Sequence, residues 1–171
     1  MKILITNDDS IHAPGIALLA KVAKEFGEVT VVAPAQQCSA MSQKLTIHGD
    51  MQLEKVDDFP VKVKSAYKLA GTPVDCVKVA LHYVLEEKPD YVFSGINDGY
   101  NVGYDISYSG TLGAAFEAVK NGQLSPVFFG SALNNFGIEP FLESFLKMTT
   151  SPLVRQTVSG EVDPFDEHFS A

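Results

Sequence analysis

The feature that most constrains the fold is an apolar strand, an amphipathic helix and a second apolar strand in succession at the start of the chain. Lys2–Thr6 is an apolar, β-branched run that ends in polar turn residues, as buried strands do. A helix follows from Pro14 to Gly27, with apolar residues at helical spacing. Val29–Val32 is the next strand. Such a unit predicts two parallel strands joined by a right-handed crossover.

The same alternation returns farther along. A helix starts at Thr72, a plausible N-cap, and runs to Pro89. Asp90–Ser94 is a third parallel strand, and a further helix begins at Ser109–Thr111. Between these units, residues 44–70 alternate apolar and polar residues at period two, which predicts antiparallel strands at one side of the core. We therefore expect an α/β fold: a three-layer, doubly wound, mostly parallel, Rossmann-like sheet with an inserted antiparallel β segment.

The length of 171 residues is that of one domain. We expect an α/β core over residues 1–130, which includes a strand at Pro126–Phe129. Residues 131–171 are expected to form a C-terminal helix, Ile138–Met148, and a tail.

Charge and composition exclude several classes of partner. The chain has 13 Lys and Arg against 21 Asp and Glu, a net charge of −8. This balance argues against binding a nucleic-acid duplex or an anionic membrane, because both require a positive surface. No apolar stretch reaches the roughly 18 residues of a membrane span. With two cysteines, no disulfide framework and no secretory signal pattern, we expect a cytoplasmic protein.

Asp8 and Asp9 follow the first strand directly. Adjacent carboxylates repel each other unless a cation lies beside them, so such pairs serve hard metals such as Mg²⁺ or Mn²⁺. A solvated turn or a helix cap is the simpler interpretation. Ligands of doubly wound sheets bind beyond the carboxyl ends of the strands, however, and the acids occupy that position.

The loop after the second strand contains Gln37, Cys38 and Ser39. A parallel neighbouring strand would bring Gln37 and Ser39 beside the acids, where the Ser39 hydroxyl could complete a set of oxygen ligands. The alternative is an ordinary surface loop. Cys38 is most simply a small packed residue.

Residues 94–111 contain four glycines and two asparagines and lead directly into a helix. Tight turns with free amides bind anions, and a helix N-terminus adds unpaired N–H groups and partial positive charge. Ser109, Gly110 and Thr111 are therefore a candidate phosphate site, although a glycine-rich connection with a serine cap would look the same. The segment matches neither a Walker loop nor a dinucleotide fingerprint.

These loops together predict metal-assisted phosphoryl transfer to water. Asp8, Asp9, Ser39 and Asn97 would hold a divalent cation, and the helix start would bind phosphoryl oxygens. A bound cation would also let a net-negative protein accept a phosphate ester.

His12 and Asn101 are candidates for substrate contact, although a surface residue before the helix is the simpler interpretation of His12. Tyr100, Tyr104 and Tyr108 lie in or beside the glycine-rich segment and would either stack on a base or pack beneath the loop.

Several separate motifs resemble the SurE family, the survival protein E nucleotidases. They are Ile3–Ser10 with its Asn-Asp-Asp run, Val32–Pro34 with Gln37 and Ser39, Gly71–Val77, Ser94–Asn97 with Gly99, Asn101, Gly103 and Asp105, and Tyr108–Thr111 with Gly113–Ala115. After Lys120 the match becomes loose, and residues 131–171 match the family poorly.

The resemblance implies a 5′-nucleotidase, a phosphoric monoester hydrolase that releases phosphate from 5′- and 3′-nucleoside monophosphates through metal-activated water. It also implies one Mg²⁺ or Mn²⁺ per subunit, held at Asp8, Asp9, Ser39 and Asn97, and a cytoplasmic homodimer or homotetramer. Asp8, Asp9 and Asn97 are then the expected catalytic residues.

Two alternatives remain from other classes. A receiver-like Mg²⁺-binding signalling module also places an acid pair after its first strand, but it requires an acceptor Asp where this chain has Ser94–Asn97. An inactive homologue kept as a binding protein would share the core motifs.

Overall fold

The computed structural model describes residues 1–99, 101, 103–120, 155–157 and 160–162. The chain forms two compact units, Met1–Val127 and Phe128–Ala171. Within the second unit, β6 (Arg155–Thr157) and β7 (Gly160–Val162) pair antiparallel. The expected strand at 126–129 and helix at 138–148 lie outside the described residues. In the part of the chain that is described, no helix combines the length and apolar character that crossing a membrane needs.

A five-stranded sheet forms the centre of the first unit, in the order β3-β4-β2-β1-β5. Its strands are β1 (Lys2–Thr6), β2 (Glu28–Pro34), β3 (Leu53–Lys55), β4 (Ser65–Leu69) and β5 (Tyr91–Ser94). All neighbours pair parallel except β3 and β4. The chain therefore builds the sheet outward from β1 in one direction and returns to its other side for β5. The strand order reverses between β1 and β5.

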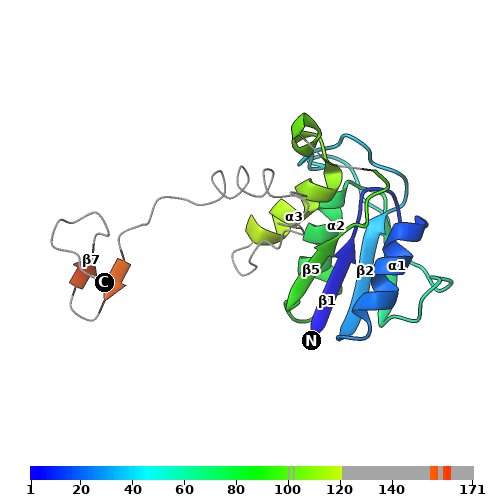
Figure 1. Ribbon diagram of the computed structural model, residues 1–171, viewed down its shortest axis with the longest axis horizontal. Coiled ribbons are helices and arrows are strands. Elements are labelled where there is room, and N and C mark those ends of the chain that lie inside the picture. Colours follow the sequence, from blue (N-terminus) through cyan, green and yellow to red (C-terminus); the bar gives the residue numbers. More distant parts are fainter. Residues whose placement is uncertain (100, 102, 121–154, 158–159, 163–171) are drawn as a thin grey trace, which may run out of the picture. The chain divides into compact units, whose positions relative to one another are not determined.

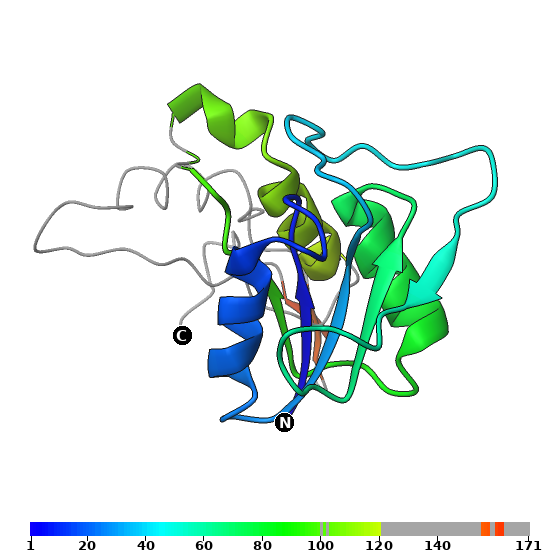
Figure 2. The same ribbon diagram turned by 90° about the vertical axis from the view of Figure 1, so that its right-hand side faces the viewer.

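Helices cover both faces of the sheet, which gives the expected three layers. Figures 1 and 2 show α1 (Pro14–Ala23) on one face, and α2 (Pro73–Val79) and α3 (Gly110–Lys120) on the other. Alternate residues of a strand point to opposite faces. Ile3 and Ile5 thus pack with α1, while Leu4 packs with α2. The α/β fold is confirmed.

The segment 44–70 differs in part from the prediction. β3 and β4 pair antiparallel as expected, but β4 also pairs parallel with β2, with Val32 opposite Tyr67. β4 is therefore an inner strand of the main sheet. Period-two alternation reports a half-buried strand and carries no information about the direction of its neighbour.

Residues 44–48, expected as a strand, form none. Their polar groups bond instead to the start of α2: the Thr46 N–H and hydroxyl donate to Asp75 at 3.0 and 2.6 Å, and the Thr72 hydroxyl donates to the Lys44 carbonyl at 2.6 Å. These bonds satisfy polar groups of the segment that a neighbouring strand would otherwise have to pair, so the segment does not need a partner in the sheet.

α2 begins as predicted, with Thr72 as its N-cap. The Asp75 N–H donates to the Thr72 hydroxyl at 3.2 Å and the Asp75 carboxylate accepts from the Thr72 N–H at 2.9 Å, a reciprocal capping box. Burial raises the pKa of Asp75, but the hydrogen bonds from Thr46 and Thr72 outweigh it and leave the pKa below its ordinary value. The helix continues through the π-helical turn η1 (Ala80–Val84) and so ends before the expected Pro89.

The turn after β1 is held by Asn7. Its side-chain N–H donates to the Ser10 carbonyl at 2.9 Å, and Ser10 has a φ of 96°. This conformation disfavours any residue with a Cβ, so the turn stores backbone strain next to the acid pair.

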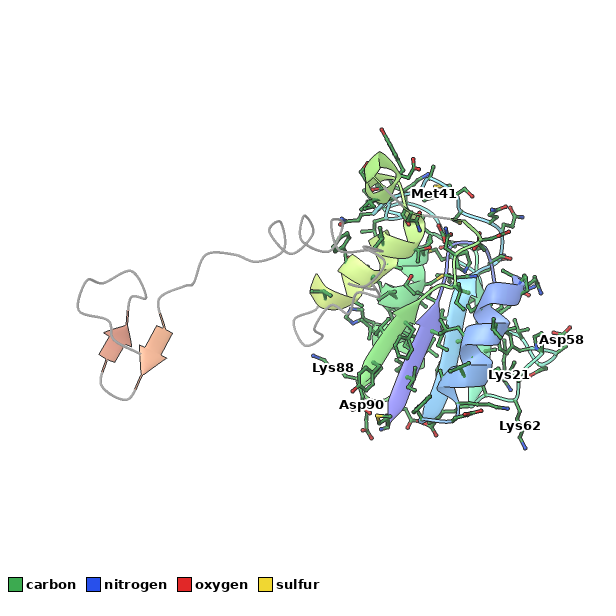
Figure 3. The ribbon with its side chains drawn as sticks, in the orientation of Figure 1. Lys21, Met41, Asp58, Lys62, Lys88 and Asp90 are labelled. Carbon is green, nitrogen blue, oxygen red and sulfur yellow. The ribbon has the colours of Figure 1, made fainter. Side chains whose placement is uncertain are left out.

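We predict that Asp75→Asn lowers the free energy of unfolding at pH 7 by roughly 1–3 kcal/mol, because an amide has one accepting oxygen in place of two and cannot accept all three bonds donated by Thr46 and Thr72. Since the folded-state pKa is lowered, the wild-type advantage is present at neutral pH and shrinks as pH falls below about 4. Urea unfolding of the wild type and the variant between pH 7 and 3 measures this difference in the free energy of unfolding. The exposed Asp58→Asn (Figure 3) is the control, and a difference that stays constant with pH would contradict the assignment.

We predict that Ser10→Gly raises the free energy of unfolding by about 1 kcal/mol, because glycine adopts a positive φ without steric cost. Ser10→Ala is the matched control: it removes the hydroxyl and keeps the Cβ, so it should bring no gain. Thermal unfolding of the wild type and the two variants measures the change in stability. An equal gain in the free energy of unfolding from both substitutions would refute backbone strain at Ser10.

Candidate functional site

The loops after β1, β2 and β5 meet at the carboxyl edge of the sheet. The Cys38 N–H donates to the Asp8 carbonyl at 2.7 Å, and the Gly95 N–H donates to the Thr6 carbonyl at 2.9 Å. In Figure 3, Met41 marks this edge, and Lys88 and Asp90 lie at the opposite end of the strands. The strand order reverses here, which is where doubly wound sheets bind ligands.

Asp8 is buried, with 6% of its surface exposed. Its Oδ1 accepts a hydrogen bond from the Thr111 hydroxyl. The start of α3 approaches it so closely that a Cβ on Gly110 would lie 2.9 Å from the Asp8 Cβ and 3.1 Å from Oδ2. Glycine is therefore required at 110, and the positive end of the helix faces the carboxylate.

Asp9 is more exposed and is held from two sides. Its Oδ2 accepts from the Asp98 N–H at 2.9 Å, and its Oδ1 accepts from the Gln37 side chain at 3.5 Å. The loops after β5 and β2 thus both contact this carboxylate. Gln37 lies beside the acids as the sequence predicts.

Asn97 is brought next to Asp8 through Thr111. The Asn97 Oδ1 lies 3.5 Å from the Thr111 hydroxyl oxygen, while its Nδ2 donates to the Gly99 carbonyl at 3.1 Å. The latter bond fixes which end of the amide is an oxygen. Asp8 and Asn97 therefore direct oxygen atoms toward the same hydroxyl.

Ser39 lies one residue beyond the backbone bond between Cys38 and Asp8, and its side chain is exposed. No hydrogen bond joins its hydroxyl to another residue that the structure describes. Its role as a ligand stays a prediction.

The donor set fits a hard divalent cation. Within the described ranges, no Lys, Arg or His lies within ion-pair distance of Asp8 or Asp9, so a buried carboxylate has no positive side chain beside it. Such burial is costly unless a cation compensates the charge. No three His, Cys, Asp and Glu side chains cluster among the described residues. The predicted ligands are instead oxygens of two acids, an amide and a hydroxyl, which Mg²⁺ and Mn²⁺ prefer.

Two side chains of the candidate phosphate site already form hydrogen bonds within the protein. The Ser109 hydroxyl accepts from the Leu112 N–H at 3.3 Å and caps α3, and the Thr111 hydroxyl donates to Asp8. The N–H groups of Gly110 and Thr111 have no hydrogen-bond partner in the described part of the chain, as expected in a first helical turn. Backbone amides, rather than the two hydroxyls, are the free donors.

The remaining candidates lie around this group. His12 is exposed in the turn before α1, and Asn101 is half-buried. Neither forms a hydrogen bond with another described residue. Tyr108 is 60% exposed, while Tyr100 lies outside the described residues and nothing is described of the Tyr104 side chain.

Cys38 is buried beside the site. Burial and the neighbouring Asp8 carboxylate raise the pKa of its thiol. A thiol with a raised pKa is a poor nucleophile at neutral pH. The packed role expected for Cys38 is therefore consistent with its surroundings.

Sequence reasoning missed two supporting residues. Asn7 is fully buried and holds the strained turn, and its Oδ1 has no hydrogen-bond partner in the described part of the chain. Ser94 ends β5 and donates to the Thr111 carbonyl at 2.6 Å. The tendency of Asn to form local turns is a signal for the first. Nothing local indicates the second, because its partner lies 17 residues away.

The chain is similar to known proteins over the residues that form this site. The family model Survival protein SurE matches residues 3–135. A protein named 5′-nucleotidase SurE from a Thermoanaerobacter species is 49% identical over 123 residues, 71% of this chain and 48% of that protein. The protein of the same name from Geobacter sulfurreducens is 45% identical over 122 residues, 71% of this chain and 44% of that one.

The crystal structure of the Sure protein from Aquifex aeolicus superposes with a TM-score of 0.66 at 34% identity, covering 88% of this chain and 62% of that one. The chain spans about half the length of the curated relatives it matches. Since the family model covers most of the chain and its motifs meet in one site, the chain belongs to the SurE family.

Proposed function

We propose that this chain carries a divalent-metal-dependent phosphatase site for 5′- and 3′-nucleoside monophosphates. The observation that carries the proposal is the buried Asp8 carboxylate, which lies at the strand-order reversal with Asp9 and Asn97 and has no positive side chain of the described residues beside it. The relatives that this chain resembles are named 5′-nucleotidase SurE, which supports the substrate class.

In this proposal Asp8, Asp9, Ser39 and Asn97 hold one Mg²⁺ or Mn²⁺ per subunit. When bound, the cation would polarise the phosphoryl group and lower the pKa of a water that attacks it. Asp8, Asp9 and Asn97 act as catalytic residues because they keep that chemistry in a fixed geometry.

The phosphate group is proposed to bind at Ser109, Gly110 and Thr111 through the free backbone N–H groups of the first turn of α3. His12 and Asn101 are proposed substrate contacts. The net charge of −8 makes the arrangement necessary, since an acidic protein repels a phosphate ester unless positive charge is placed locally.

The assembly is proposed as a cytoplasmic homodimer or homotetramer that binds neither a nucleic-acid duplex nor a membrane. The acidic balance supports the absence of both of those partners. A receiver-like module is disfavoured by the strand ends: β5 ends in Ser94, and β4 ends in Leu69. Neither strand ends in the Asp that such a module phosphorylates.

We predict that the protein releases phosphate from adenosine monophosphate in Mn²⁺, and that a chelator stops the release. Asp8→Asn and Asn97→Ala should each lower kcat by roughly 100-fold or more, because each removes a ligand of the cation that would stabilise the developing charge. A phosphate-release assay with Asp58→Asn as the surface control measures this.

Turnover that is insensitive to chelator, or kept by Asp8→Asn, would defeat the mechanism. Mn²⁺ binding without turnover would instead indicate an inactive homologue that acts as a binding protein. Covalent labelling by acetyl phosphate without turnover would favour the receiver interpretation.

A further inference from the structure

The Thr111 hydroxyl lies between two of the predicted metal ligands. It donates to Asp8 Oδ1, and its oxygen is 3.5 Å from Asn97 Oδ1. The residue is buried, with 9% of its surface exposed. Sequence reasoning placed Thr111 in the phosphate site because it lies in the first turn of α3, so the contact with the acid is a different role for the same side chain.

The single proton of the Thr111 hydroxyl decides whether the side chain contacts Asp8 or a phosphate. A threonine hydroxyl has one proton to donate, while a carboxylate oxygen and an amide oxygen can only accept. Asp8 takes that proton, which leaves the Thr111 oxygen with lone pairs alone for any further partner. A phosphate oxygen is also an acceptor and would be repelled, so the hydroxyl cannot serve Asp8 and a phosphate together.

Thr111 is itself held from two sides. Its carbonyl accepts from the Ser94 hydroxyl at 2.6 Å, which ties it to the end of β5. The adjacent Gly110 lets the helix backbone approach Asp8, because a Cβ there would meet Asp8 Cβ at 2.9 Å. A β-branched side chain also has few rotamers in a helix. The hydroxyl is therefore fixed relative to both the sheet and the acid.

We propose that Thr111 is a positioning residue, whose hydroxyl orients the Asp8 carboxylate for a divalent cation and does not bind the phosphate of the substrate. The inference rests on the proposed metal site. With Oδ1 held by Thr111, the other carboxylate oxygen, Oδ2, and the Asn97 amide oxygen are left to face the cation. Residues that hold a metal ligand in place act through it and influence affinity for the metal.

The test is direct Mn²⁺ binding, measured by calorimetry without nucleotide. Thr111→Val keeps the shape and removes the hydroxyl, and it should weaken the Mn²⁺ Kd by about 10- to 100-fold. Thr111→Ser should restore most of the affinity. Thr30→Val is the matched control, because it removes a buried hydroxyl in the first half of β2 that accepts a hydrogen bond from the Ser65 hydroxyl, away from the acids, and it should leave the Kd unchanged.

A second readout separates positioning from phosphate binding. At saturating Mn²⁺, Thr111→Val should keep the wild-type KM for adenosine monophosphate, since its hydroxyl makes no contact with the phosphate. A raised KM under those conditions would overturn the inference. If the valine variant fails to fold, the pair Thr111→Ser and Thr111→Ala isolates the same hydroxyl, and equal Mn²⁺ affinity of that pair would overturn it too.

The outcomes distinguish this inference from the function on which it rests. Equal Mn²⁺ affinity in wild type and Thr111→Val overturns the role of Thr111 and leaves the metal site intact. A wild-type protein that binds no Mn²⁺ overturns the metal site, and the role of Thr111 with it.

Discussion

The architecture at the carboxyl edge depends on one constraint: the Asp8 carboxylate is buried just after β1, and no positive side chain of the described residues lies beside it. Removing the Asp8 carboxylate from water is unfavourable, and the start of α3 offsets part of that cost with a hydrogen-bond donor and partial positive charge. The first turn of α3 faces it, and the Thr111 hydroxyl donates to it. The remaining negative charge is what the proposed cation would compensate.

The position of that carboxylate follows from the order of the strands. Because β1 lies between β2 and β5, the loops that leave the carboxyl ends of three adjacent strands converge on the residues after β1. A right-handed crossover places α1 on one face of the sheet, and the return to β5 places α2 on the other, where α3 packs beside it (Figure 2). Asn97 and Asp98 reach the acids from one side, and Gln37 reaches them from the other.

Local patterns in the sequence were enough to predict the α/β fold and the strand and helix starts at Lys2, Pro14 and Thr72, because periodicity and turn residues act over a few positions. They were not enough for β4, whose parallel pairing with β2 depends on where the whole chain returns. Local patterns also do not predict the hydrogen bond between Thr111 and Asp8, because these residues lie 103 positions apart in the chain. The acid pair itself was predicted, since its place after a buried strand is a local feature.

Several contacts between segments at the carboxyl edge of the sheet involve backbone atoms alone. The Cys38 N–H meets the Asp8 carbonyl, the Ser42 N–H meets the Tyr108 carbonyl at 2.9 Å, and Gly113 sits so near the Ser42 carbonyl that a Cβ would lie 2.0 Å from it. Bonds of this kind do not depend on which side chains the loop carries. Substitutions at the exposed residues of the loop after β2 would therefore leave these backbone contacts, and with them the placement of the acids, unchanged.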